Sequence, residues 1–148
     1  MLTSTLIKLF SRDLEKLKQE IEAYKEEEKL WIVTKEISNS TGNLCLHIIG
    51  NLNHFIGAVL GNTGYIRQRD LEFSLKDIPV KKMVRQIDDT INVVQNTLSK
   101  LTERDLQEEY KRNPFEYYMT TEYFLVHLSM HLAYHLGQIN YHRRLLIT

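Results

Sequence analysis

The feature that most constrains this chain is one uninterrupted stretch, residues 120–146, with the sequence TTEYFLVHLSMHLAYHLGQINYHRRLL. It contains no proline and a single glycine, so it predicts one long helix. His127, His131 and His135 are four residues apart and share one face of that helix, and His142 lies close to it. Buried imidazoles need hydrogen-bond partners, and two histidines at i and i+4 can bind one metal ion. We therefore take this face as the candidate site.

Three further segments have the periodicity of long helices: 3–29, 42–60 and 80–101. The first and third are apolar on one face, and the second is apolar on most sides, with Ser40 or Thr41 as its predicted N-cap. The connection over 61–79 is too long for a tight hairpin, so it predicts a crossover with the second and third long helices running parallel. A partly helical connection, 102–118, precedes the last helix. We expect an all-α fold, a four-helix bundle in one domain over residues 1–148.

The second predicted helix supplies a facing partner for the histidine stripe. With His47 as reference, Asn43, Gly50 and Asn51 lie within about 60° around the helix, so this face is small and polar. The small residues leave room for the His47 imidazole. His54 lies about 10 Å further along the helix, so it could be a ligand in place of His47 but not easily together with it.

These residues suggest a metal site made of His47, His131 and His135. Three imidazoles around a divalent ion leave a coordination position open, which is typical of reactive sites rather than structural ones. An ion in such a site lowers the pKa of bound water to about 7 or deprotonates a bound thiol. Gln138 and Asn51 are placed to hydrogen-bond the imidazoles from outside. The spacing alone leaves two interpretations open, a metal site or core histidines that only pack.

Composition narrows the function classes. Lys plus Arg and Asp plus Glu both number 19, so the neutral chain has no basic groove for nucleic acid or an acidic membrane. No segment has the roughly 20 apolar residues of a membrane span, and the N-terminus has no signal-peptide core. The single cysteine, Cys45, fits a reducing compartment, and we expect a cytoplasmic protein. Cys45 points away from His47 on the helix, so we reject it as ligand and as nucleophile.

The long connection also carries polar and aromatic residues that could line the mouth of a site: Tyr65, Arg67, Arg69 and Phe73. We favour the simpler interpretation, in which they tie the connection to the end of the bundle.

Three segments resemble one known family, the DinB-like (YfiT-like) proteins. HLAYHLGQINYHRRLL is similar to the H-x-x-x-H-x-G-Q-I signature of their last helix, and LCLHIIGNL resembles the segment with their other histidine. GYIRQRDLEF resembles the arginine-rich segment of one uncharacterised branch. The resemblance implies a four-helix bundle, a divalent ion such as zinc or nickel, and a homodimer. The family's metal ligands carry over onto His47, His131 and His135. The histidines that do not match are interpreted as neighbours of the site or as core and surface residues: His54, His127 and His142.

The resemblance also suggests a function. Some relatives are thiol-dependent transferases or isomerases that use a low-molecular-weight thiol such as bacillithiol or mycothiol. We expect a metal-dependent enzyme, a transferase or hydrolase acting on a small-molecule substrate or thiol, with a solvent-open pocket of a few hundred Å³ beside the ion. The sequence assigns no general base: His127, one turn before His131, is the only candidate, and packing is an equally good interpretation of it. One alternative is a non-catalytic metal-binding stress-response dimer, with the open position blocked. The other is a helical interaction module that binds no metal.

Overall fold

The computed structural model describes residues 1–146. The regular elements within this range are all helices, and no strand occurs among them. The four long helices are α1 (Leu2–Glu22), α2 (Thr41–Leu52), α4 (Val80–Ser99) and α6 (Thr121–Leu146). Between them lie four short elements: a 3₁₀ helix, η1 (Glu27–Trp31), a π-helix, η2 (Asn53–Ala58), and the α-helices α3 (Arg69–Ser74) and α5 (Glu103–Gln107).

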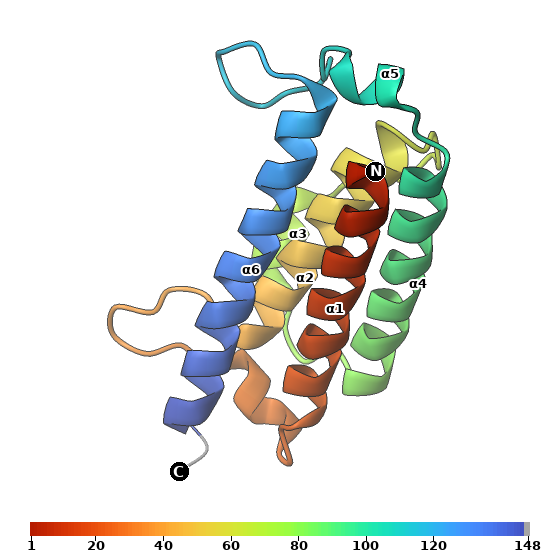
Figure 1. Ribbon diagram of the computed structural model, residues 1–148. Coiled ribbons are helices and arrows are strands. Elements are labelled where there is room, and N and C mark those ends of the chain that lie inside the picture. The colour runs from red at the N-terminus through yellow and green to blue at the C-terminus, as the bar shows by residue number, and fades with distance from the viewer. Residues whose placement is uncertain (147–148) are drawn as a thin grey trace.

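The long helices lie side by side (Figure 1). Helices α1 and α2 each contact both α4 and α6. Figure 1 shows α2 and α4 running in one direction and α1 and α6 in the other, so the connection over 61–79 crosses from one end to the other. This arrangement is compatible with a four-helix bundle. Within residues 1–146, no helix is both long enough and apolar enough to cross a bilayer.

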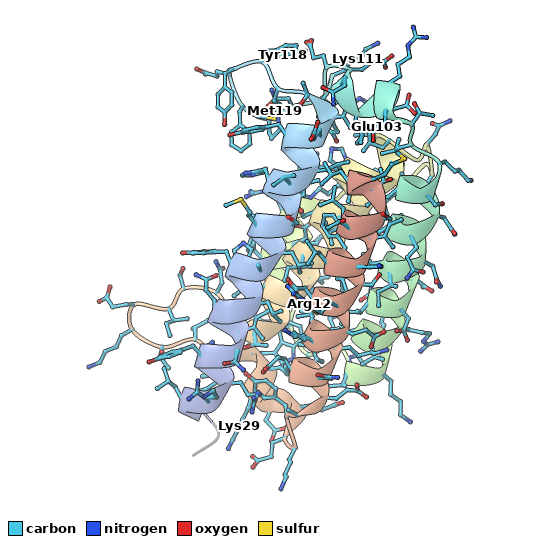
Figure 2. All side chains as sticks on the ribbon, in the orientation of Figure 1. Arg12, Lys29, Glu103, Lys111, Tyr118 and Met119 are labelled. Carbon is cyan, nitrogen blue, oxygen red and sulfur yellow. The ribbon has the colours of Figure 1, made fainter. Side chains whose placement is uncertain are left out.

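The apolar residues of the long helices meet in one core. Helix α1 illustrates how the sequence produces it, because its apolar residues recur every three or four positions and are at most 2% exposed: Leu6, Phe10, Leu14, Leu17 and Ile21. Side chains fill the space between the helices, while Lys29 lies at one end of the molecule and Glu103 and Lys111 at the other (Figure 2). The core therefore holds α2 and α6 in fixed register, which is what positions the histidines.

The first helix is shorter than the sequence predicts. It ends at Glu22, and the chain resumes as η1 rather than continuing to Lys29. The reason lies just beyond, where Leu30 is fully buried and the Trp31 ring packs so closely on Gly42 that a Cβ there would lie 2.6 Å from it. A straight continuation would carry both side chains away from the core. The charged residues 25–28, which precede Lys29 and Leu30, are exposed.

Helix α2 begins as predicted, because the Ser40 hydroxyl accepts a hydrogen bond from the Asn43 backbone N–H. The crossover holds a helix, α3, that the periodicity did not indicate. Asn43 anchors it: its amide nitrogen donates to the backbone oxygens of Glu72 (3.0 Å) and Leu75 (2.8 Å). The first turn of α2 thus fixes the end of α3, which places the Glu72 side chain beside the middle of α2.

Candidate metal centre

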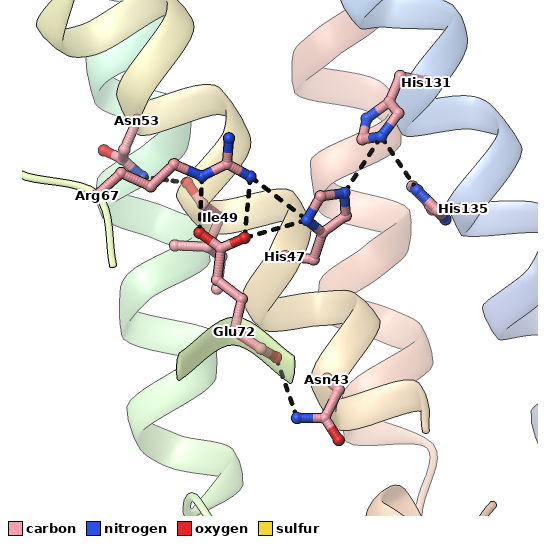
Figure 3. Close-up of polar contacts among 8 residues, drawn as sticks. All are labelled: Asn43, His47, Ile49, Asn53, Arg67, Glu72, His131 and His135. Atoms are coloured by element: carbon pink, nitrogen blue, oxygen red, sulfur yellow. Dashed lines mark hydrogen bonds and ion pairs between the residues drawn. The ribbon is translucent and has the colours of Figure 1, made fainter. Parts of the chain in front are cut away.

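Three imidazoles converge between α2 and α6. Nε2 of His131 lies 3.3 Å from Nε2 of His47 and 3.1 Å from Nε2 of His135 (Figure 3). One ring nitrogen from each histidine falls within 4.8 Å of the others. The i, i+4 pair comes from α6, and His47 comes from the buried face of α2. The structure therefore brings together the three residues that the spacing singled out.

Glu72 determines the tautomer of His47. Its Oε1 lies 3.0 Å from His47 Nδ1, and both side chains are buried. A carboxylate can only accept, so Nδ1 carries a hydrogen, and in the neutral imidazole, the form that binds metal, the Nε2 lone pair would face the cluster. Arg67 Nη2 also lies 3.4 Å from Nδ1, but a protonated Nδ1 cannot accept from it. The shorter contact to the carboxylate is the hydrogen bond.

Arg67 holds Glu72 in turn. Its Nε and Nη2 each donate to one carboxylate oxygen at 2.9 Å (Figure 3). Burial by itself raises the pKa of Glu72, but the hydrogen bonds from His47 and Arg67 outweigh it, and the pKa is lowered. Glu72 is therefore an anion at neutral pH.

Gln138 determines the tautomer of His135, as Glu72 determines that of His47. Its amide oxygen lies 2.8 Å from His135 Nδ1, so Nδ1 donates and Nε2 is left with a lone pair. Burial lowers the pKa of His135, which keeps the ring neutral.

His131 lies between these two nitrogens and cannot satisfy both. Burial, followed by the repulsion of the His135 and His47 imidazoles, lowers the pKa of His131 to about 3, so the ring is neutral. A neutral ring has at most one hydrogen on Nε2, and both neighbouring Nε2 atoms present lone pairs. At least one of the two short contacts therefore sets lone pair against lone pair.

A cation bound by the three nitrogens would remove that conflict. Neutral imidazole is the form that binds metal, and two nitrogens bound to one tetrahedral zinc ion at about 2.05 Å lie about 3.3 Å apart. The separations from His131 to the other two histidines match this value. The residues therefore fit a divalent ion.

Space for the Glu72 carboxylate comes from Gly50. A Cβ at that position would lie 1.8 Å from Glu72 Oε2. The small, polar face predicted for α2 thus accommodates a carboxylate as well as the imidazole. The sequence did not identify Glu72, which lies in a six-residue helix within a connection; its one signal was the segment GYIRQRDLEF, which carried part of the family resemblance.

For two of the four connection residues, the favoured interpretation was wrong. Arg67 and Phe73 belong to the site, since Arg67 binds Glu72 and the Phe73 ring lies 4.9 Å from that of His47, centroid to centroid. Arg69 is stacked on Phe73 instead. Tyr65 is partly exposed beside Glu72.

Asn51 does not hydrogen-bond an imidazole as predicted. Its side-chain oxygen is buried without a partner among the described residues, because Glu72 holds His47 Nδ1. Cys45 is fully buried, and burial raises the pKa of its thiol to about 12, so it is no nucleophile.

The remaining histidines lie outside the cluster. His54 packs on the Phe55 ring. His127 packs on the rings of Phe115 and Phe124. His142 is 4% exposed, and neither ring nitrogen has a partner among residues 1–146.

A cavity of about 340 Å³ adjoins the cluster at His135. Residues 36–39 form one wall, and the second half of α6 forms the other. Figure 1 shows the loop before α2 standing beside the lower part of α6. A small molecule in this cavity would contact a member of the histidine cluster.

A comparison with models of known protein families gives a match over nearly the whole chain. The model of a family described as "Protein of unknown function (DUF1572)" matches residues 3–148. No curated protein matches the chain.

Proposed function

This chain belongs to the family described as protein of unknown function, DUF1572, and we propose that it is a divalent-metal-dependent enzyme with the ion held by His47, His131 and His135. The proposed substrates are small molecules, with a low-molecular-weight thiol as one reactant in an S-transferase or isomerase reaction. Zinc and nickel are the proposed metals, since imidazole suits both.

The convergence of three Nε2 atoms carries this proposal. Glu72 accepts a hydrogen bond from Nδ1 of His47, and Gln138 accepts one from Nδ1 of His135. The Nε2 lone pairs of these two imidazoles are therefore directed at the Nε2 atom of His131. Histidines that only packed in a core would instead pair a donor with an acceptor. Partners on the far ring nitrogen are characteristic of metal-binding histidines.

The cavity beside His135 favours catalysis over storage or sensing. Three protein ligands leave a coordination position for another molecule, and a bound ion would supply the Lewis acidity that favours a coordinated thiolate. His47 is buried, whereas His131 and His135 are partly exposed, so access is from the α6 side. A non-catalytic metal protein would have no need for the cavity.

Elemental analysis of tag-free protein from its native host tests the metal. We expect about one zinc or nickel ion per chain, and His131→Ala should lose it. His127→Ala is the matched control, because His127 lies one turn earlier on α6 and packs on aromatic rings instead. Wild-type protein without metal, or equal metal in both variants, would contradict the proposal.

Activity is tested separately with the metal-loaded protein. Thiol transfer to a small electrophile should require metal and disappear in His131→Ala but not in His127→Ala. Full metal occupancy without turnover of any thiol or electrophile would support a non-catalytic metal protein instead.

We also propose a DinB-like (YfiT-like) four-helix bundle that works as a homodimer in the cytoplasm. The parallel course of α2 and α4 supports the bundle. Apolar residues exposed on the outer face of α6 support the dimer, and they are Tyr123, Val126, Met130 and Tyr134.

A further inference from the structure

Residues 61–77, most of the connection between α2 and α4, lie on the surface with three exceptions. Arg67, Glu72 and Phe73 are the residues in this range that are not exposed. Glu72 Oε1 lies 3.0 Å from His47 Nδ1, and Arg67 Nη2 lies 3.4 Å from it (Figure 3). The Phe73 ring lies 4.9 Å from the His47 ring, centroid to centroid. All three inward-facing side chains of this segment therefore meet at one member of the histidine cluster.

The segment has few other attachments to the bundle. Ile66 is 84% exposed, and Leu71 and Leu75 are each 39% exposed. A segment that buries few apolar side chains opens locally at a low cost in free energy. Apart from the two backbone oxygens that accept from Asn43, its polar attachment to α2 is made at His47.

Arg67 acts on His47 through Glu72. Its Nε and Nη2 each donate to one carboxylate oxygen at 2.9 Å, and its side chain is 12% exposed. A guanidinium bound in this way fixes the plane of the carboxylate, and so directs one oxygen at His47 Nδ1. Without the guanidinium, the buried carboxylate would keep only His47 as a side-chain partner.

Metal binding and the attachment of this segment require the same form of His47. An imidazole that binds metal through Nε2 carries its one hydrogen on Nδ1, and this is the hydrogen that Glu72 accepts. An ion in the cluster therefore favours the attached segment. By thermodynamic reciprocity, the attached segment favours the ion by the same factor.

We propose that residues 61–77 form a clasp whose attachment to His47 and metal binding at the histidine cluster stabilise each other. Arg67 is the positioning residue of the clasp, because it holds the Glu72 carboxylate against the imidazole. This coupling rests on the ion of the proposed function but not on the reaction.

Hydrogen exchange of the full-length protein, followed by mass spectrometry, tests the coupling. Amides of residues 61–77 should exchange at least about fivefold more slowly in zinc-loaded protein than in metal-free protein kept with a chelator. Helix α5 is the internal control, because it is also a short helix in a connection but is held by a core residue, Leu106. Its exchange should not depend on zinc.

Substitution of Arg67 tests its role. Arg67→Met should raise the zinc dissociation constant about tenfold and speed the exchange of residues 61–77 in metal-free protein. Arg67→Lys keeps the charge but cannot bridge both carboxylate oxygens, so it should recover only part of the loss. Arg69→Met is the matched control, since it removes the same charge from the same segment but Arg69 stacks on Phe73. It should change the constant less than about twofold.

The combination of Arg67→Met with Glu72→Gln separates action through the carboxylate from an independent effect. If Arg67 acts only through Glu72, the double variant should bind zinc no more weakly than Glu72→Gln alone. Additive losses, equal losses in Arg67→Met and Arg69→Met, or wild-type affinity in Arg67→Met would overturn the role of Arg67.

The exchange measurement on the wild type needs no variant and decides the clasp itself. Stoichiometric zinc binding with unchanged exchange of residues 61–77 would overturn the coupling and leave the proposed function standing. A wild type that binds no zinc would overturn both.

Discussion

Glu72 fixes the orientation of His47 without belonging to the histidine cluster. Its carboxylate accepts from His47 Nδ1 and from two nitrogens of Arg67, all at 2.9–3.0 Å. Because the carboxylate is buried and anionic, it increases the basicity of the imidazole and holds its ring plane. At the scale of single residues, the affinity of the site should therefore depend on a side chain that touches no ion.

Glu72→Gln tests this dependence. The amide keeps the shape but loses the charge, and it leaves the Arg67 guanidinium without its anion. We expect the zinc dissociation constant, measured by competition with a chelating dye, to rise about 10- to 100-fold. Glu28→Gln is the control, because Glu28 is exposed in η1 and far along the chain from the site. An unchanged zinc dissociation constant in Glu72→Gln would show that the carboxylate does not contribute to metal affinity.

Gly50 and Gly137 form a matched pair of glycines in long helices. Alanine is the better helix former by about 1 kcal/mol, so Gly137→Ala, with nothing within 4 Å of the new Cβ, should raise the free energy of unfolding by roughly 0.5–1 kcal/mol. Gly50→Ala places a Cβ 1.8 Å from Glu72 Oε2 and should lower it by about 1–3 kcal/mol. Urea denaturation measures both. Stabilisation by both substitutions would mean that the carboxylate moves without cost.

Single residues also show where sequence reasoning succeeds and where it stops. His131 and His135 share a face because of their spacing alone, and the small face of α2 indicated His47, so their proximity could be predicted. The proximity of Glu72 to His47 could not be predicted, because it depends on how the connection packs on α2 through the hydrogen bonds of Asn43. Asn51 lies at the predicted position on the helix, but the Glu72 carboxylate, a stronger acceptor, occupies the hydrogen-bonding position at His47 Nδ1.

The same contrast holds for whole elements. The α6 prediction over 120–146 is nearly the observed Thr121–Leu146, since a long periodic pattern without breakers determines a helix locally. The π-helical continuation of α2, η2, has no local signature of this kind. Helix α3 is only six residues long and carries no full period of apolar residues. Short elements of this kind depend on tertiary contacts.

Helix α6 has a second face that the core does not use. Met130 and Tyr134 are each 66% exposed and lie with Tyr123 and Val126 along the outer side. The sequence offered no sign of a surplus apolar face, because the helix is apolar on several sides. Exposed apolar stripes are common at protein–protein contacts, and this one is the face on which the proposed homodimer would form.

Met130→Arg should therefore shift the mass measured by light scattering from dimer to monomer, since a buried unpaired charge opposes association. Ile66→Arg is the matched control: Ile66 is 84% exposed on the connection before α3, so the dimer should persist. Zinc content should not change in either variant. A monomeric wild type, or a dimeric Met130→Arg, would exclude α6 as the interface.

The whole molecule should lose stability on acidification. Burial lowers the pKa of four histidines below 6.5: His54, His131, His135 and His142. In the unfolded chain these groups titrate near 6.5, so between that pH and the lower folded values the unfolded state binds more protons. Their contribution to the free energy of unfolding is complete above about pH 6.5 and is lost as the pH falls. For His131 the loss continues down to about pH 3.

Glu72 acts in the same direction at lower pH, because its folded pKa is also depressed. We expect the urea midpoint of metal-free protein, kept with a chelator, to be lower at pH 5.5 than at pH 7.5. The chelator matters because protons also displace metal from imidazoles, which would produce a loss of the same sign. His131→Gln removes the most strongly shifted of the four histidines, so its midpoint should depend less steeply on pH. Equal midpoints at the two pH values would show that the buried imidazoles accept protons as readily in the folded chain as in the unfolded one.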